Sequence, residues 1–478
     1  GSATVHFPIW HQEIEDILVL KNNKGTEDNR VRKLDYSIQI TKLFYERFIK
    51  NEDITLFSPN NVPGLYEAFG MPEFDELYKK YEADKTIPKT TIAAQELFMD
   101  MLKERAETGR IYIMNLDHCN SHSSFKDKVY MSNLCQEITL PTIPIQHIDD
   151  KEGEIALCIL SAINLGLIND LNELEELCDL SVRALDEIID YQEYPVESAK
   201  ISTQARRSLG IGYIGLAHYL AKNQVSYESK AAVKLVDKVT EAFQYFLLKA
   251  SNNLAKEKSK CLWFEKTKYS EGILPIDTYK KELDEIISRK YTYDWEWLRK
   301  EIKEHGLRHS TLSAQMPSES SSVVSNATNG VEPPRDYLSV KKSKKGPLKQ
   351  IVPDYNRLKN FYTLLWDMKS NEGYINIISV MQKYFDQAIS GNWSYNPENY
   401  KDGEVPLSIM AQDLLTTYKL GWKTAYYQNT YDAKSEIDEP VHPIGWHDGV
   451  EEVDNSKTEW KEENKEILND EDCESCTI

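Results

Sequence analysis

Residues 154–165, EIALCILSAINL, form a short, largely apolar run of the kind found in buried strands. Next comes NDLNELEELCDLSVRALDEIIDY at residues 169–191, where apolar side chains recur at helical spacing. A second β-like run, SLGIGYIGLA, follows at residues 208–217. Strand and helix patterns that alternate along a chain favour an α/β fold over an all-helical one.

The alternation continues on both sides of this stretch. Helical spacing is also seen at residues 30–50, 90–109 and 233–259, and strand-like runs occur at residues 109–116 and 423–430. Gly109 closes the second of these helical stretches, as a glycine often does just past the end of a helix. We therefore expect α/β structure up to about residue 431.

The last segment, residues 432–478, has a different composition. It contains 16 Asp and Glu against 4 Lys, and hydrophobic periodicity stops before it begins. This pattern predicts a flexible acidic tail. Cys473 and Cys476 form a C-x-x-C pair near its end, a spacing that closes readily into a disulfide and exchanges with other dithiols. A zinc site would need a second pair, which the sequence lacks.

Composition narrows the class of protein. A net charge of −20 argues against binding to a nucleic acid polymer. No apolar run approaches the roughly 18 residues of a membrane span, and no signal peptide is seen at the start. The odd number of cysteines, 7 in 478 residues, suits a reducing cytoplasm better than a disulfide framework. No Cys/His cluster has metal-ligand spacing, so no metal site is expected in this chain.

Three long stretches carry a specific resemblance. They are SNLCQEITLPT with GEIALCILSAINLG (residues 132–142 and 153–166), STLSAQMPSESSSVVSNATNGVEPPR (310–335) and YKLGWKTAYYQNT (418–430). Together they resemble the C-terminal part of the large, catalytic subunit of an aerobic, class I ribonucleotide reductase. The resemblance covers essentially residues 7–430, and long ordered motifs are far more specific than one short motif.

The resemblance implies a particular architecture. Residues 1–431 would form most of a ten-stranded α/β barrel with a central finger loop, plus a C-terminal α/β region, and residues 432–478 a redox tail. The opening barrel strands and the regulatory segments of the family would lie upstream and are expected to be missing. Such a half-barrel would expose apolar strand edges, which favours a subunit split between two genes, as in some phages, over an arbitrary truncation. Division by an intein or insertion is the third possibility.

Four residues match the reaction centre of the family. Removing a ribose 2′-hydroxyl needs a radical at the 3′ carbon, an acid for the leaving water and two electrons. By resemblance, Cys135 forms the thiyl radical, Glu137 is the base at the 3′-hydroxyl and Asn133 binds the ribose. Alternate positions in an extended loop would place these three side chains on one side. Cys158 matches one cysteine of the redox pair, whose partner lies upstream in the family.

Two further groups follow from the resemblance. Tyr426 and Tyr427 match the tyrosine pair that relays a radical, although adjacent tyrosines in a strand normally point to opposite faces. The substrate phosphates would bind before the helix expected at residues 322–328, and an ordinary serine-rich helix cap is the simpler alternative there. The phosphate-binding residues would be Pro317, Ser318, Glu319, Ser320 and Ser321. The remaining thiols, Cys119, Cys178 and Cys261, are assigned to structure.

The implied function is the reduction of ribonucleotides, with a ribonucleoside diphosphate as the expected substrate. The sequence alone leaves a triphosphate open. The implied partners are an N-terminal fragment of the large subunit, a metal-containing R2-type small subunit that supplies the radical, and thioredoxin or glutaredoxin. No cofactor would be bound by this chain itself. The alternative is a catalytically inactive module that binds the small subunit or nucleotide, but the presence of Cys135, Glu137 and the tail cysteines argues against it. A glycyl-radical or cobalamin enzyme fits the motifs less well.

Overall fold

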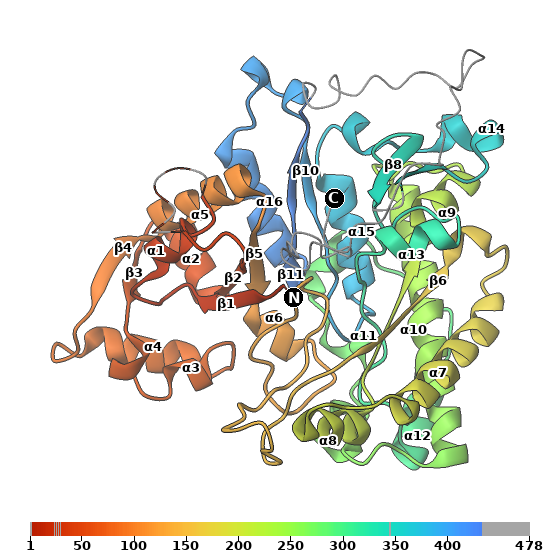
Figure 1. Ribbon diagram of the computed structural model, residues 1–478, viewed down its shortest axis with the longest axis horizontal. Helices are drawn as coiled ribbons and strands as arrows, with labels where there is room; N and C mark the ends of the chain where they lie inside the picture. Colours follow the sequence, from red (N-terminus) through yellow and green to blue (C-terminus); the bar gives the residue numbers. More distant parts are fainter. Residues whose placement is uncertain are drawn as a thin grey trace, which may run out of the picture.

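A four-stranded sheet in the order β1-β2-β5-β11 forms one half of the molecule (Figure 1). Its strands are β1 (Thr4–Pro8), β2 (Asp35–Ile40), β5 (Ile111–Asn115) and β11 (Thr424–Ala425). β1, β2 and β5 run parallel, whereas β11 pairs antiparallel with β5. The computed structural model describes residues 2–432 except 23, 25, 27, 29, 344 and 345. The expected redox tail, with Cys473 and Cys476, lies outside the described residues.

A second group of strands forms the other half. β6 (Ile159–Asn164) pairs in parallel with β7 (Leu209–Ile214), and α7 (Glu173–Tyr191) and α8 (Glu197–Arg206) connect the two. Residues 311–315 lie next to β7, because the Ile211 N–H donates to the Leu312 carbonyl at 2.8 Å. Residues 388–391 come next, since the Gln315 N–H donates to Ala388 at 3.1 Å and the Tyr426 N–H to Gly391 at 2.8 Å. This last contact joins the two halves.

The mixed α/β class is confirmed, but the expected portion of a ten-stranded barrel is not. Among the described residues, β1 has only β2 as a neighbour and β6 has only β7, so both strands are edges. β7 is buried along its whole length, whereas Leu160 in β6 is 42% exposed. The described strands therefore form an open arrangement.

Long helices cover both halves (Figure 1). The central one is α10 (Lys230–Lys258), which packs against α7, α12 (Trp295–His305) and α15 (Glu372–Gln382). It is buried on most of its surface, as expected for a helix inside a large core. On the other half, α5 (Ala94–Thr108) packs against α2 (Lys42–Lys50) and α16 (Leu407–Lys419). No helix in the described part of the chain is long and apolar enough to cross a membrane.

The other elements are short. The remaining helices are α1 (Ile14–Leu18), α3 (Leu65–Ala68), α4 (Phe74–Ala83), α6 (Leu116–Ser121), α9 (Leu216–Lys222), α11 (Pro275–Thr278), α13 (Glu319–Val324) and α14 (Tyr355–Leu358). The remaining strands are β3 (Asp53–Leu56), β4 (Thr90–Ala93), β8 (Leu338–Ser343), β9 (Gly346–Ile351), β10 (Trp393–Tyr395) and β12 (Gln428–Thr430). Several 3₁₀ turns connect them.

Two predicted helices are wrong in part. Residues 90–109 begin with strand β4 (Thr90–Ala93), and helix α5 follows only from Ala94. Residues 30–50 contain strand β2 followed by helix α2 rather than a single helix. The apolar side chains of Tyr36, Ile38 and Ile40 are spaced by two, which suits a strand, and they continue directly into the helical spacing of α2. The helix over 233–259 and the strand over 109–116 are confirmed as α10 and β5. α5 ends at Gly109, whose φ of 69° is left-handed.

Candidate active site

The loop that carries Cys135 is a turn, not an extended segment. The Gln136 N–H donates to the Asn133 carbonyl at 3.3 Å, and Gln136 has a left-handed φ of 72°. The Asn133 side chain folds back and accepts the Ile138 N–H at 3.1 Å. The expectation that strand-like alternation aligns Asn133, Cys135 and Glu137 is therefore wrong. The turn determines where these side chains point. A left-handed backbone at a non-glycine residue such as Gln136 persists only because its surroundings hold it.

Cys135 lies against the tyrosine pair. The Tyr426 hydroxyl is 3.4 Å from the Cys135 sulfur, and the rings of Tyr426 and Tyr427 are 3.9 Å apart. Both tyrosines lie between β11 and β12 rather than inside a strand, and their rings contact each other at a tilt of 39° instead of pointing to opposite faces. Tyr112, on β5, lies with its ring 4.8 Å from Tyr426 and 5.7 Å from Tyr427. These four residues form one buried cluster.

Two arginines hold this cluster in place. The Arg105 guanidinium donates to the Tyr426 carbonyl at 2.7 Å and to the Tyr427 carbonyl at 3.2 Å. Burial lowers the pKa of Arg105 to about 10. Arg110 lies over the Tyr427 ring at 4.9 Å from its centre, a cation–π contact. Burial also raises the pKa of Tyr426, so its hydroxyl keeps its proton at neutral pH.

Glu137 is held by a segment far away in the sequence. The Ser390 hydroxyl lies 3.2 Å from a Glu137 carboxylate oxygen and also donates to the Cys135 carbonyl. The Ala388 N–H donates to the Glu137 carbonyl at 2.9 Å. Glu137 is only 2% exposed, so its carboxylate sits in a largely water-excluded place. The side chain of Ser390 thus touches both residues expected at the reaction centre.

Cys158 lies just before β6, at the open edge of the β6–β7 pair. Its sulfur is 3.4 Å from the Gln387 amide nitrogen. On the other side, a Cβ at Gly210 would come within 2.9 Å of this sulfur, so only glycine fits there. Burial raises the pKa of Cys158.

The expected phosphate-binding residues lie at the start of α13. The helix begins at Glu319, with Ser318 as its N-cap residue, and not after the serines as expected. The physical reason is that the serine run itself forms the first turn, where small polar residues are favoured. The Ser318 N–H is occupied by the Asn329 side chain at 3.1 Å, whereas Ser320 and Ser321 are exposed. This turn follows directly on residues 311–315, which bond to the Ala388 segment.

Sequence reasoning missed Tyr112, Arg105, Gln387 and Ser390. No local sequence motif identifies these residues, because each one contacts a residue that is hundreds of positions away in the sequence. The three remaining described thiols are buried, in line with a structural assignment: Cys119, Cys178 and Cys261. Burial raises the pKa of Cys119 and of Cys261 to about 12, which makes both poor nucleophiles.

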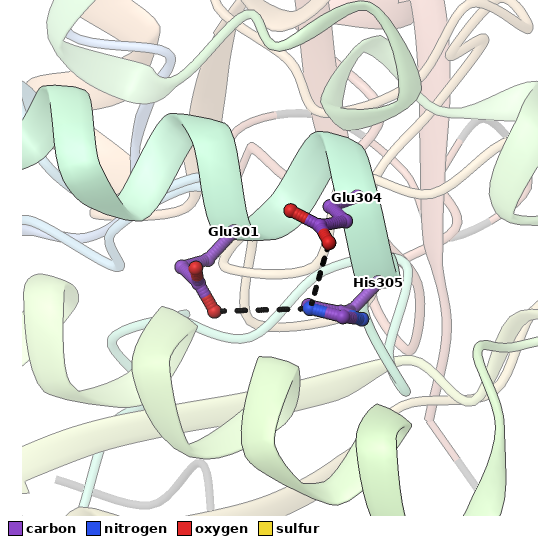
Figure 2. A group of neighbouring side chains, drawn as sticks. All are labelled: Glu301, Glu304 and His305. Atoms are coloured by element: carbon purple, nitrogen blue, oxygen red, sulfur yellow. Dashed lines mark ion pairs between the residues drawn. The ribbon is translucent and has the colours of Figure 1, made fainter.

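One group of described side chains has metal-ligand spacing. Figure 2 shows Glu301, Glu304 and His305 on the last turns of α12, with ligand atoms within 4.8 Å of one another. The Lys256 ammonium already lies 2.5 Å from the Glu301 carboxylate. The group belongs to the surface of α12 and shares no residue with the loop around Cys135.

Comparison with known proteins assigns the chain to one class of enzyme. The model of the family "Ribonucleotide reductase, barrel domain" matches residues 1–428. The chain therefore belongs to the ribonucleotide reductase family, and its matching region corresponds to the large subunit of class I.

The relatives are named as alpha subunits of ribonucleoside-diphosphate reductase. The chain is 58% identical to that of Haemophilus influenzae over 92% of its own length and 59% of the relative. It is 56% identical to subunit alpha of reductase 1 of Escherichia coli, over 94% of this chain and 60% of the relative. Identity to the subunit of Enterobacteria phage T4 is 44%, over 92% and 59%. The chain thus spans about three fifths of the length of these relatives.

Proposed function

We propose that this chain is the catalytic, C-terminal part of a ribonucleotide reductase large subunit and reduces ribonucleoside diphosphates to deoxyribonucleotides. The observation that carries the proposal is the contact between the Tyr426 hydroxyl and the Cys135 sulfur at 3.4 Å. A hydrogen atom can pass directly between the two groups at this distance. The surrounding cluster of Tyr112 and Tyr427 gives the oxidising equivalent a route to Tyr426.

The proposed radical reaction starts at Tyr426. A tyrosyl radical at Tyr426 takes the hydrogen atom of the Cys135 thiol, which gives a tyrosine and a thiyl radical. The thiyl radical takes the 3′ hydrogen of the ribose, and Glu137 accepts the 3′-hydroxyl proton. The 2′-hydroxyl then takes a proton from the redox thiol pair that includes Cys158 and leaves as water. Asn133 would hydrogen-bond the ribose, and residues 317–321 would bind the substrate phosphates at the start of α13.

Two electrons are needed for each product. In this proposal they come from the thiols of Cys158 and of an upstream cysteine, which become a disulfide. One thiol hydrogen leaves in the water and the other is added to the 2′ carbon. Cys135 then returns the hydrogen atom to the 3′ carbon, Glu137 returns the proton to the 3′-hydroxyl, and the thiyl radical passes back to Tyr426. The tail dithiol, Cys473 and Cys476, then reduces that disulfide by thiol exchange. Thioredoxin or glutaredoxin re-reduces the tail in the reducing cytoplasm. Residues 1–431 are thus the catalytic part and residues 432–478 the redox tail.

The open strand edges support the proposal that a partner chain binds to this one. Leu157 and Leu160, beside Cys158, are 37% and 42% exposed at the free edge of β6. An unpaired edge with apolar side chains is a place where another strand adds. We propose that an N-terminal part of the large subunit supplies that strand and the missing cysteine. A metal-containing R2-type small subunit would supply the radical.

Reconstitution tests the proposal. The chain is mixed with the matching N-terminal part and an R2-type small subunit, and deoxyribonucleotide formation from a ribonucleoside diphosphate is measured. Turnover should require all three components. Cys135→Ser should abolish it without loss of folding, because a serine O–H bond is too strong to form the radical, while Cys119→Ser serves as the control. Turnover in the Cys135→Ser variant would show that Cys135 is not the radical site. No turnover in the wild-type mixture would favour an inactive binding module instead.

A further inference from the structure

Gln387 is fully buried between the two halves of the molecule. Its backbone N–H donates to the Ser313 carbonyl at 3.0 Å, next to β7. Its carbonyl accepts the Lys423 ammonium at 2.9 Å, at the start of β11. The residue thus has a fixed backbone position, and its side chain has little freedom to move.

The Gln387 side chain makes three hydrogen bonds, so both of its polar atoms have partners. Its carbonyl oxygen accepts the Thr139 N–H at 3.2 Å, and its amide donates to the Leu209 carbonyl at 2.9 Å and to the Cys158 sulfur at 3.4 Å. The orientation of the amide is determined by these partners. A flipped amide would place N–H against N–H at Thr139 and oxygen against oxygen at Leu209. The group that faces the sulfur is therefore an N–H donor.

We infer that Gln387 is a positioning residue for Cys158, which ties its sulfur to the loop of Cys135 and Glu137 and offers an N–H to its thiolate. Thr139 is two residues from Glu137 in that loop, and Ala388, next to Gln387, bonds the Glu137 backbone. One short segment therefore sets the place of both the base and the redox thiol. The inference rests on the proposed redox function of Cys158.

The charges around the sulfur show why such a donor is needed. Burial is the main cause that raises the pKa of Cys158, and the carboxylates of Glu137 and Asp386 raise it further. The hydrogen bond from Gln387 acts in the opposite direction. The thiolate is the form that exchanges with other thiols and disulfides, and hydrogen bonds to ionised groups are the stronger ones. Lys423 approaches Gln387 on its backbone side and bonds the Asp386 carbonyl as well.

The test is the pH dependence of Cys158 alkylation in the full chain. Gln387→Met keeps the length of the side chain but removes the donor. The pH midpoint of Cys158 alkylation, followed by mass spectrometry, should rise by about one pH unit. At a given pH, labelling should therefore be roughly ten-fold slower. Gln315→Met is the matched control, since Gln315 is an equally buried glutamine that bonds Tyr213 and not the sulfur. Melting curves verify that both variants are folded.

Two outcomes would overturn the inference. One is a folded Gln387→Met chain whose midpoint moves no further than that of Gln315→Met. The other is a reconstituted enzyme in which Cys158→Ser is inactive but Gln387→Met keeps the wild-type pH–rate profile. Failure of the proposed function looks different, because Cys158→Ser would then remain active while the alkylation shift is still seen. A rise in the midpoint together with an altered pH–rate profile supports the inference.

Discussion

At the scale of single residues, the Tyr426 hydroxyl is the atom on which the proposed radical step depends. Tyr426→Phe removes this hydroxyl, which lies 3.4 Å from the Cys135 sulfur, and keeps the buried ring. We expect turnover to be lost, at a stability cost of only about 1 kcal/mol for the missing hydrogen bond. The measurement is product formation beside a melting curve.

The control for this substitution is Tyr213→Phe. Tyr213 is equally buried and its hydroxyl bonds Thr240, far from the Cys135 loop in the sequence. It should lose a similar amount of stability and keep its turnover. An active Tyr426→Phe enzyme would remove Tyr426 from the radical route.

Ser390 is the second residue whose role can be separated from the fold. Ser390→Ala removes the hydroxyl that lies 3.2 Å from the Glu137 carboxylate. The single hydroxyl hydrogen is shared between the Cys135 carbonyl and the Glu137 carboxylate, so we expect kcat to fall by up to about ten-fold with little change in KM. Ser251→Ala, at a buried serine that bonds His309, is the matched control. An unchanged kcat with a lowered Tm would mean that Ser390 supports the fold alone.

The sequence motifs predicted which residues lie together, but not the backbone conformation that brings them together. Cys135, Glu137 and the tyrosine pair could be identified because they stand in long ordered motifs. The alternation argument for the loop failed, since a turn at Gln136 with a left-handed backbone cannot be read from residue types. Ser390 and Gln387 could not be predicted, because their contacts with the loop and with Cys158 depend on the packed chain.

At the scale of secondary structure elements, the free edge of β6 is the feature with the clearest consequence. Leu160→Lys places a charge on a side chain that is 42% exposed there. The isolated chain should melt at a nearly unchanged temperature, because little buried area is lost. Its affinity for the N-terminal part should fall, since a lysine on an edge strand opposes the addition of another strand. Titration calorimetry of the two parts measures this.

The control at this scale is Leu262→Lys. Leu262 is even more exposed, at 79%, and lies outside the strands. It should leave the affinity unchanged. Equal affinities for both variants and wild type would show that β6 is not the docking edge.

The observed helix and strand boundaries agree with the sequence prediction where a single hydrophobic spacing covers the whole element. α10 and β5 matched their patterns because each has a single spacing over its whole length. The stretch over residues 30–50 did not, because a strand and a helix join there across Thr41 alone. The barrel expectation came from the resemblance, and the described strands stay open at β1 and β6.

At the scale of the whole molecule, the tail is expected to act as a tethered reductant. A flexible chain of the 42 residues from Tyr431 to Cys473 would span about 35 Å, and such a tether would give a local dithiol concentration of about the millimolar range. Replacing Cys473 and Cys476 together by Ser should leave the first turnover intact. Later turnovers with thioredoxin should fail, and a small dithiol should restore them in part. Product per active site is the measurement, and sustained thioredoxin-driven turnover would contradict the tethered role.

The pairing of β11 with β5 also has a consequence for how the chain folds. Tyr426 follows β11 directly, and it meets Cys135 across 291 residues of sequence. Contacts of such separation form slowly, because a long loop must close first. On the ribosome, β1, β2 and β5 emerge long before their last partner, so the edge of β5 stays uncovered until β11 has been made. A chain that ends early, by a premature stop codon, lacks both that strand and the tyrosines. It leaves an exposed strand for chaperones and proteases to recognise and, if the tyrosines carry the radical as proposed, it has no activity.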